Sequence, residues 1–249
     1  MEVVLHKCIE DFLEDYSCHF LKESGYNPKT RKHSKKLLLY DDFGNDYNID
    51  GVITDESMRP LVLLESKYIR YKKHNRDKGS WICNAHSAIR KRYSSIRSSI
   101  AVLAGSWSKS SLAMIRSYDI NVFLIPFDYI ADILLARGID FRWEEKEKEK
   151  AMTAWLAYDA LPESEKNKIG EEMVDLIKNK LYDFLKDLLD DSKTRELKAI
   201  AIEILTSKGE VKRYTFPTKE DAVEFLEQLS LDEEFQDSSL LTIYDIPEV

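Results

Sequence analysis

The stretch at residues 48–67, NIDGVITDESMRPLVLLESK, constrains the fold of this chain more than any other segment. It predicts two β-strands joined by a polar turn at residues 55–60, which makes the strands antiparallel neighbours. The second strand contains the run LVLLES, which is apolar enough for a central strand covered on both faces. We therefore expect a layered α/β fold around this strand pair.

Three charged side chains lie on this strand pair. Asp50 is on the first strand, and Glu65 and Lys67 are on the second. Because side chains alternate along a strand, Glu65 and Lys67 should share a face while Ser66 points away. A solvated strand face with a cross-strand ion pair is one interpretation. The apolar run before Glu65 favours burial instead, and buried charges need partners or a metal.

Apolar spacing and turn residues predict the elements around this pair. An amphipathic helix is expected at residues 2–24, and a first strand at 36–43 completes a three-strand meander. Strand–helix–strand–helix order after residue 97 predicts parallel neighbours joined by right-handed crossovers. The expected helices are 81–97, 112–118 and 127–137, and the expected strands are 100–105 and 121–126.

Charge is divided unevenly along the chain, although the net charge is −8. Residues 1–139 hold 21 Lys and Arg against 17 Asp and Glu, whereas residues 140–249 hold 16 against 28. We therefore expect two domains, 1–139 and 140–249. The second is predicted as an acidic α+β domain for dimerisation or partner contact. Its expected elements are a long helix at 163–189, a hairpin at 197–216, a helix at 218–229 and a strand at 240–244.

The element order and the pattern Asp50-x14-Glu65-x-Lys67 resemble the PD-(D/E)xK nuclease superfamily, which includes type II restriction endonucleases and archaeal Holliday-junction resolvases. The resemblance covers residue 2 to about residue 137. Ile49 stands where the namesake motif has proline. The resemblance implies a restriction-endonuclease-like core, a mixed central sheet flanked by helices, with the α+β region as an extension.

The resemblance also implies phosphodiester hydrolysis assisted by Mg²⁺, with Mn²⁺ as a substitute. Asp50 and Glu65 would be metal ligands, and the Ser66 backbone carbonyl would be a third, because hard cations take oxygen ligands. Lys67 would hold or deprotonate the attacking water and offset charge in the transition state. Glu10, in the first helix, would be an outer ligand or would support a second metal, or it would be an exposed helix acid. Whether His86 joins the site stays open.

A basic stretch follows the motif. Between Lys67 and Arg97 there are ten Lys or Arg and a single acid, Asp77. A solvated charged face would have the same composition, but its position directly after Lys67 favours contact with phosphates. The predicted DNA-binding residues are Lys72, Lys73, Arg76, Lys78, Arg90, Lys91 and Arg92.

These features together predict a Mg²⁺-dependent DNA endonuclease, for restriction or defence, acting as a homodimer by analogy with restriction enzymes. Two alternatives stay open: a structure-selective repair or recombination nuclease, and a non-catalytic DNA-binding module with a nuclease-like fold. The scattered glycines form no phosphate-binding loop, so no nucleotide cofactor is expected. Three cysteines without metal-ligand spacing and the absence of a long apolar run predict a cytoplasmic protein outside the membrane.

Overall fold

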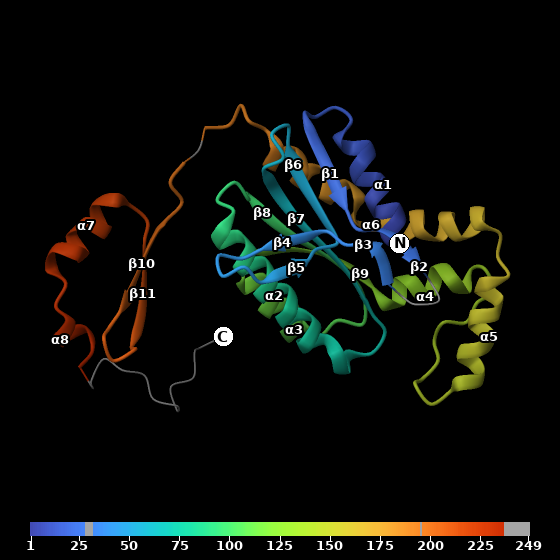
Figure 1. Ribbon diagram of the computed structural model, residues 1–249. Helices are drawn as coiled ribbons and strands as arrows, with labels where there is room; N and C mark the ends of the chain where they lie inside the picture. The colour runs from blue at the N-terminus through green and yellow to red at the C-terminus, as the bar shows by residue number, and fades with distance from the viewer. Residues whose placement is uncertain (28–31, 195, 237–249) are drawn as a thin grey trace. The chain divides into compact units, whose positions relative to one another are not determined.

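The computed structural model describes residues 1–27, 32–194 and 196–236 (Figure 1). The chain forms two compact units, Met1–Asp190 and Asp191–Val249. The first unit contains a five-stranded mixed sheet with helices on both faces. This arrangement confirms the expected α/β core.

The central sheet combines an antiparallel half and a parallel half. The first three strands in sheet order pair antiparallel, and the last three pair parallel. In sheet order the strands are β1 (Cys18–Lys22), β6 (Gly51–Asp55), β7 (Pro60–Ile69), β8 (Ser98–Gly105) and β9 (Ile120–Pro126). The expected parallel neighbours are confirmed, and β7 occupies the centre.

Helices cover both faces of this sheet (Figure 1). On one face, apolar side chains of α1 (Glu2–Leu13), α4 (Phe127–Leu135) and α6 (Glu163–Leu189) share a core cluster with Val62 and Leu64 of β7. On the other face, α2 (Asn75–Arg92) and α3 (Lys109–Ser117) cover Leu63 and Ile69. Strand β7 is therefore buried from both sides, as its apolar run predicts.

The N-terminal prediction was wrong in its second half. The expected helix at 2–24 ends at Leu13, and β1 follows as the edge strand beside β6. Phe20 fits a helical spacing, but in β1 its ring covers Gly51, where an added Cβ would lie 2.7 Å from ring carbons. Apolar residues that the helical periodicity assigned to the first helix thus belong to the edge strand β1.

The expected three-strand meander is also different. Strand β4 (Leu38–Tyr40) pairs with β5 (Asp46–Asn48) in a separate two-stranded sheet, so β1 supplies the third antiparallel strand. Upstream, β2 (Ser24–Asn27) pairs with β3 (Lys32–Lys35). Hairpins of this kind depend on backbone pairing, which composition does not reveal.

The first unit extends further than the expected domain of residues 1–139. The short helix α5 (Lys148–Asp159) adds Ala154 to the core cluster, and α6 adds Ile169, Val174 and Leu181. Because these side chains pack against α1 and the sheet, the units divide after Asp190 and not after residue 139. The change from basic to acidic composition after residue 139 therefore concerns the exposed residues, whereas the buried core of the first unit continues beyond it.

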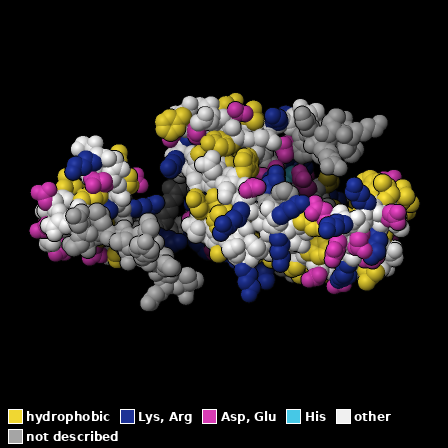
Figure 2. Space-filling model, turned by 90° about the horizontal axis from the view of Figure 1, so that it is seen from below, with side chains coloured by type: hydrophobic (Ala, Val, Ile, Leu, Met, Phe, Trp, Pro, Cys, Tyr) yellow, Lys and Arg dark blue, Asp and Glu magenta, His cyan; other side chains and the backbone are white. Residues whose placement is uncertain are grey.

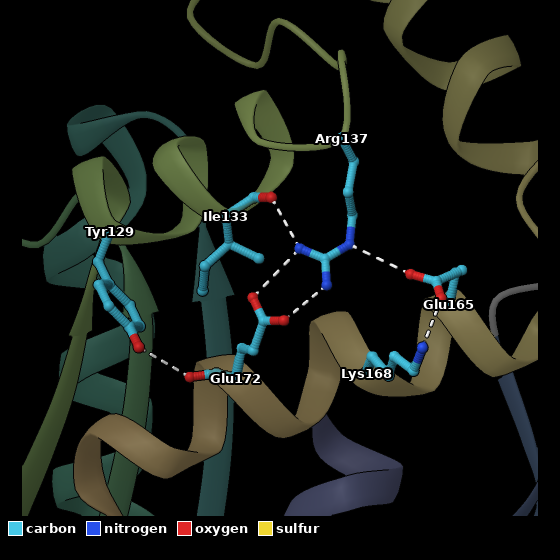
Figure 3. A network of polar contacts seen from close by, with 6 residues as sticks. All are labelled: Tyr129, Ile133, Arg137, Glu165, Lys168 and Glu172. Carbon is cyan, nitrogen blue, oxygen red and sulfur yellow. Dashed lines mark hydrogen bonds and ion pairs between the residues drawn. The ribbon is translucent and has the colours of Figure 1, made fainter.

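Polar contacts also join α4 to α6 (Figure 3). The Arg137 guanidinium donates to both carboxylate oxygens of Glu172, at 2.6 and 3.1 Å. The Tyr129 hydroxyl donates to the Glu172 carbonyl at 2.9 Å. These bonds hold the end of α4 against the middle of α6.

The second unit has the expected α+β composition. Strands β10 (Ile200–Leu205) and β11 (Val211–Phe216) form a hairpin, followed by α7 (Lys219–Gln228) and the short α8 (Leu231–Glu234). Thr218 caps α7, since its hydroxyl accepts from the Asp221 backbone N–H at 3.2 Å. The strand expected at 240–244 lies outside the described residues. No described helix in either unit is long and apolar enough to span a bilayer.

Candidate functional site

Strand register brings the two predicted acids together. Gly51 of β6 is paired with Leu64 of β7, so Asp50 and Glu65 are the next residues along each strand. Side chains at neighbouring positions of an antiparallel pair lie within contact distance. Two like charges at such a position destabilise a sheet unless a cation lies between them. The 14-residue spacing therefore has a geometric basis in this strand pair.

Lys67 is the cation at this position. Its Nζ lies 3.2 Å from both Asp50 carboxylate oxygens and also forms an ion pair with Glu65 Oε1. Alternation along β7 places Glu65 and Lys67 on the face covered by α2. The expected pairing of Asp50, Glu65 and Lys67 is thus present, and we call these three residues the triad.

Ser66 contributes more than its backbone. Its N–H donates to Asp50 Oδ2 at 2.8 Å, and its hydroxyl donates to the same oxygen at 3.2 Å. Ser66 alternates with Glu65 and Lys67 along β7, and its hydroxyl still reaches Asp50 because Asp50 lies where β6 begins and extends across to β7. These two bonds fix the orientation of the Asp50 carboxylate.

Burial sets the electrostatics of the triad. Asp50 is 4% exposed and Glu65 is fully buried. Burial, together with the Asp50 carboxylate, raises the pKa of Glu65 from 4.5 to about 8. Burial by itself lowers the pKa of Lys67, but the Glu65 and Asp50 carboxylates outweigh it, so that pKa is raised. The Lys67 ammonium therefore stays charged, and Glu65 is the carboxylate whose charged form is destabilised.

The exposed part of the site is its lysine. The Lys67 side chain is 29% exposed, against 6% for Asp50. The indole of Trp81, on α2, has its centroid 5.8 Å from Lys67 Nζ and is itself 39% exposed. A molecule approaching the acids from solvent therefore meets Lys67 and Trp81 first.

The donor set of this site fits a hard divalent cation. It offers carboxylate oxygens from Asp50 and Glu65, and two such groups leave positions for water and substrate. In an extended strand, N–H and C=O of one residue point the same way, so the Ser66 carbonyl faces the Asp50 side. No third His, Cys, Asp or Glu completes a metal cluster within the described part of the chain. A cation here would therefore rely on these two acids, a backbone oxygen and water.

Glu10 does not join these residues. Its carboxylate is paired with Lys22 of β1, with Oε1 2.6 Å from Nζ. Helix α1 packs on the sheet face opposite to α2, and Glu10 lies on this helix. The predicted role of Glu10 as a ligand is thus not supported by its contacts.

His86 is buried beneath the site on α2. It is fully buried, and neither ring nitrogen has a hydrogen-bond partner among the described residues. Burial lowers its pKa to about 3, while the Asp50 carboxylate acts in the opposite direction. The imidazole is therefore neutral, and its interaction with the charge of Asp50 places it on the triad side of α2.

The predicted DNA-binding residues separate into two groups. Three are engaged within the protein: Lys73 with Glu145, Arg90 with Asp119, and Arg92 with Asp42. The others have no ion pair among the described residues and are exposed: Lys72, Arg76, Lys78 and Lys91. On the face shown in Figure 2, Lys and Arg side chains lie among Asp and Glu rather than in one continuous patch.

Arg70, also in the basic stretch, has a structural role. Its guanidinium carbon lies 3.3 Å from the centroid of the Trp143 ring and 4.3 Å from that of Phe141. The same group donates to the backbone carbonyls of both residues at 2.9 Å. Arg70 thus anchors the segment after α4. Fewer of the ten Lys and Arg residues in this stretch are therefore available to bind DNA than the sequence suggests.

An apolar cavity of about 420 Å³ lies on the opposite sheet face. Tyr68, the residue after Lys67, borders it together with Ile130 of α4 and Trp155 of α5. It holds none of the triad residues, so the sheet separates it from the charged site.

Comparisons with known proteins leave the function open. No family model and no curated protein matches this chain. A crystal structure described as "Protein of Unknown Function AF1548" is similar at 9% sequence identity and a TM-score of 0.34. The likeness covers 74% of this chain and 100% of that chain. So low a TM-score carries no argument, and the nuclease resemblance stays a prediction.

Proposed function

We propose that this protein is a Mg²⁺-dependent DNA endonuclease with Asp50, Glu65 and Lys67 as its catalytic residues. The observation that carries the proposal is the contact of one lysine with two buried carboxylates on adjacent strands, at 3.2 Å from Asp50 and in an ion pair with Glu65. Fold maintenance does not require this arrangement, because apolar residues of similar size would fill the same place at lower cost. Titratable groups in such settings are concentrated at functional sites.

The chain's own residues would act as follows. Asp50 and Glu65 hold the metal, which when bound supplies charge stabilisation and a more acidic water. Ser66 holds Asp50 Oδ2 with two hydrogen bonds, so that Oδ1, which among the described residues accepts only from Lys67 Nζ, would be the oxygen that a metal ligates. Lys67 Nζ is positioned to donate to a phosphoryl oxygen and offset its negative charge. Burial of both acids excludes bulk water, which strengthens each of these interactions.

Cleavage of plasmid, linear duplex and single-stranded DNA with Mg²⁺ or Mn²⁺ tests the proposal. We expect the wild-type chain to cleave at least one substrate, and Asp50→Asn to lower the rate by about 10³-fold or more. Glu172→Gln, an acid-to-amide change in the α4–α6 network, is the matched control and should leave cleavage unchanged. If no substrate is cut, or if Asp50→Asn cuts as fast as wild type, the proposal is wrong.

The biological role proposed is restriction or defence. Sequencing of the cleaved ends separates this role from repair: discrete ends at one sequence support restriction, whereas cuts placed by junctions or flaps support a structure-selective nuclease. A homodimer is part of the restriction proposal, because a two-fold protein matches a palindromic site. The mass of the protein in solution tests that part directly.

The second candidate is a non-catalytic DNA-binding module. Its support is that Lys67 already neutralises one of the two acids and contacts both, so the triad has a counter-charge of its own without metal. Calorimetric titration with Mg²⁺ distinguishes the candidates. Heat of binding in wild type that is lost in Asp50→Asn supports the nuclease, and identical flat responses support the module.

A further inference from the structure

One side of α2 presents a line of exposed residues that starts beside the triad. Lys78, Trp81, Asn84 and Lys91 are all exposed, and Ala88 between the last two is half-buried. These positions follow one another at steps of three or four residues, which places them on a single face of the helix. We call this line the α2 stripe.

The charge of the stripe is free for an external partner. Lys78 and Lys91 have no ion pair among the described residues, whereas the neighbouring Arg90 and Arg92 are paired with Asp119 and Asp42. Asp77 is the single acidic residue of α2. A polyanion lying along α2 would therefore meet uncompensated positive charge at both ends of the stripe.

Trp81 is at the end of the stripe that meets the catalytic residues. Its exposed ring lies within 5.8 Å of Lys67 Nζ, and Lys67 is the exposed member of a triad whose acids are buried. A phosphate that reaches Lys67 is then within one nucleotide of a flat aromatic surface. Stacking on such a surface needs a base whose face is not already covered by its neighbours in a duplex.

We propose that the α2 stripe binds single-stranded DNA, with one unpaired base stacked on Trp81 next to the phosphate held by Lys67. This inference rests on the proposed endonuclease activity, and not on the palindromic site or the homodimer, since it names the form of the substrate at the same site. Lys78 and Lys91 neutralise flanking phosphates, and Asn84 supplies a polar contact between them. Duplex DNA binds more weakly because its bases cannot reach the indole without unstacking.

Binding to a poly-dT oligonucleotide and to a hairpin duplex of equal charge, both in EDTA, tests this inference without turnover. We expect tighter binding of the single strand and quenching of tryptophan fluorescence by it. Trp81→Ala should weaken single-strand binding by about 10-fold or more, and Trp81→Phe should retain most of it. Trp155→Ala, at a more exposed tryptophan on α5 (58% against 39% for Trp81), is the matched control.

Salt dependence tests the two lysines separately. Lys78→Ala and Lys91→Ala should each lower the slope of log affinity against log salt by about 0.7 for a single strand. Lys7→Ala, an exposed lysine on α1, should leave it unchanged. Circular dichroism of each variant establishes that the fold is retained.

Two binding results would overturn the inference: equal or tighter binding of the duplex, or a loss from Trp155→Ala as large as that from Trp81→Ala. These outcomes are separate from those of the cleavage assay, because binding is measured without metal. Strand binding through Trp81 without cleavage would sink only the proposed nuclease. Cleavage that survives Trp81→Ala undiminished would sink only the stripe.

Discussion

The first unit holds two clusters in which one cation contacts two acids, and in the second of them a further lysine, Lys168, pairs with one of the acids. In the triad, Lys67 contacts Asp50 and Glu65; in the α4–α6 network, Arg137 contacts Glu165 and Glu172 (Figure 3). The acids of the network are 35% and 46% exposed, whereas those of the triad are 0% and 6% exposed. Burial is the difference between them.

That difference reverses the effect on the acids. In the network, the hydrogen bonds from Arg137 hold the pKa of Glu172 below its ordinary value, and the bond from Lys168 does the same for Glu165. In the triad, burial raises the pKa of Glu65 to about 8 in spite of its ion pair. At the surface, a cation between two acids therefore stabilises both carboxylates in their charged form. In the buried triad one cation is not enough to do so, and a further positive charge would still be bound favourably. The second condition is the one that favours a metal site.

The largest expected effect comes from Lys67→Ala. Removing the ammonium leaves two buried carboxylates without a counter-charge, which should lower the free energy of unfolding by about 3–5 kcal/mol at pH 9. Mg²⁺ should restore part of that loss, and it should raise the melting temperature of this variant more than that of wild type. Denaturant titration with and without Mg²⁺ measures both. A variant that is as stable as wild type would show that the triad is not under electrostatic stress.

The next effect is a gain in stability from Glu65→Gln. The folded state holds a proton on Glu65 up to about pH 8, and the unfolded state releases it near 4.5. The folded state therefore binds more protons in that window, and its stability falls as pH rises from about 4.5 to about 8. Gln removes this dependence and should stabilise the fold by about 1–3 kcal/mol at pH 9 while abolishing Mg²⁺ binding. Melting temperatures across this range check it, and an unchanged slope would contradict the buried-acid account.

Arg137→Ala should have a smaller effect. Its two bonds to Glu172 lie at a half-exposed surface, so their loss should lower the free energy of unfolding by about 1 kcal/mol. The loss should shrink in high salt, stay constant between pH 6 and 9, and show no response to Mg²⁺. Denaturant titration at two salt concentrations measures it. A loss as large as that of Lys67→Ala would break the comparison between the clusters.

The smallest effect is expected from Lys168→Ala, which removes an ion pair with Glu165 at 2.7 Å from a lysine that is 59% exposed. Because solvent screens such a pair, the melting temperature should not change measurably. A clear drop would mean that the network acts as one cooperative unit and not as separate surface contacts.

Much of the fold followed from the sequence because its strongest signals are local. The apolar run of β7 predicted a central strand, and the 3.6-residue periodicity predicted α6 at residues 163–189. The failures share one cause. Phe20, read as helical, belongs to an edge strand, and α6 belongs to the first unit despite the charge step before it. Both depend on which distant surface covers a segment, and local pattern does not contain that information.

For the site, the sequence by itself determined which residues carry the charge and, through strand alternation, that Glu65 and Lys67 share a face. Only the tertiary structure decided their state. The β6–β7 register places Asp50 beside Glu65, and the helices on both faces exclude water from the two acids. Glu10, predicted as a ligand, is instead paired with Lys22. The structure also divided the basic stretch into residues paired within the protein and residues exposed on α2. The physical reason is that residue type fixes a charge, whereas its surroundings in the folded protein fix its solvation and its partners.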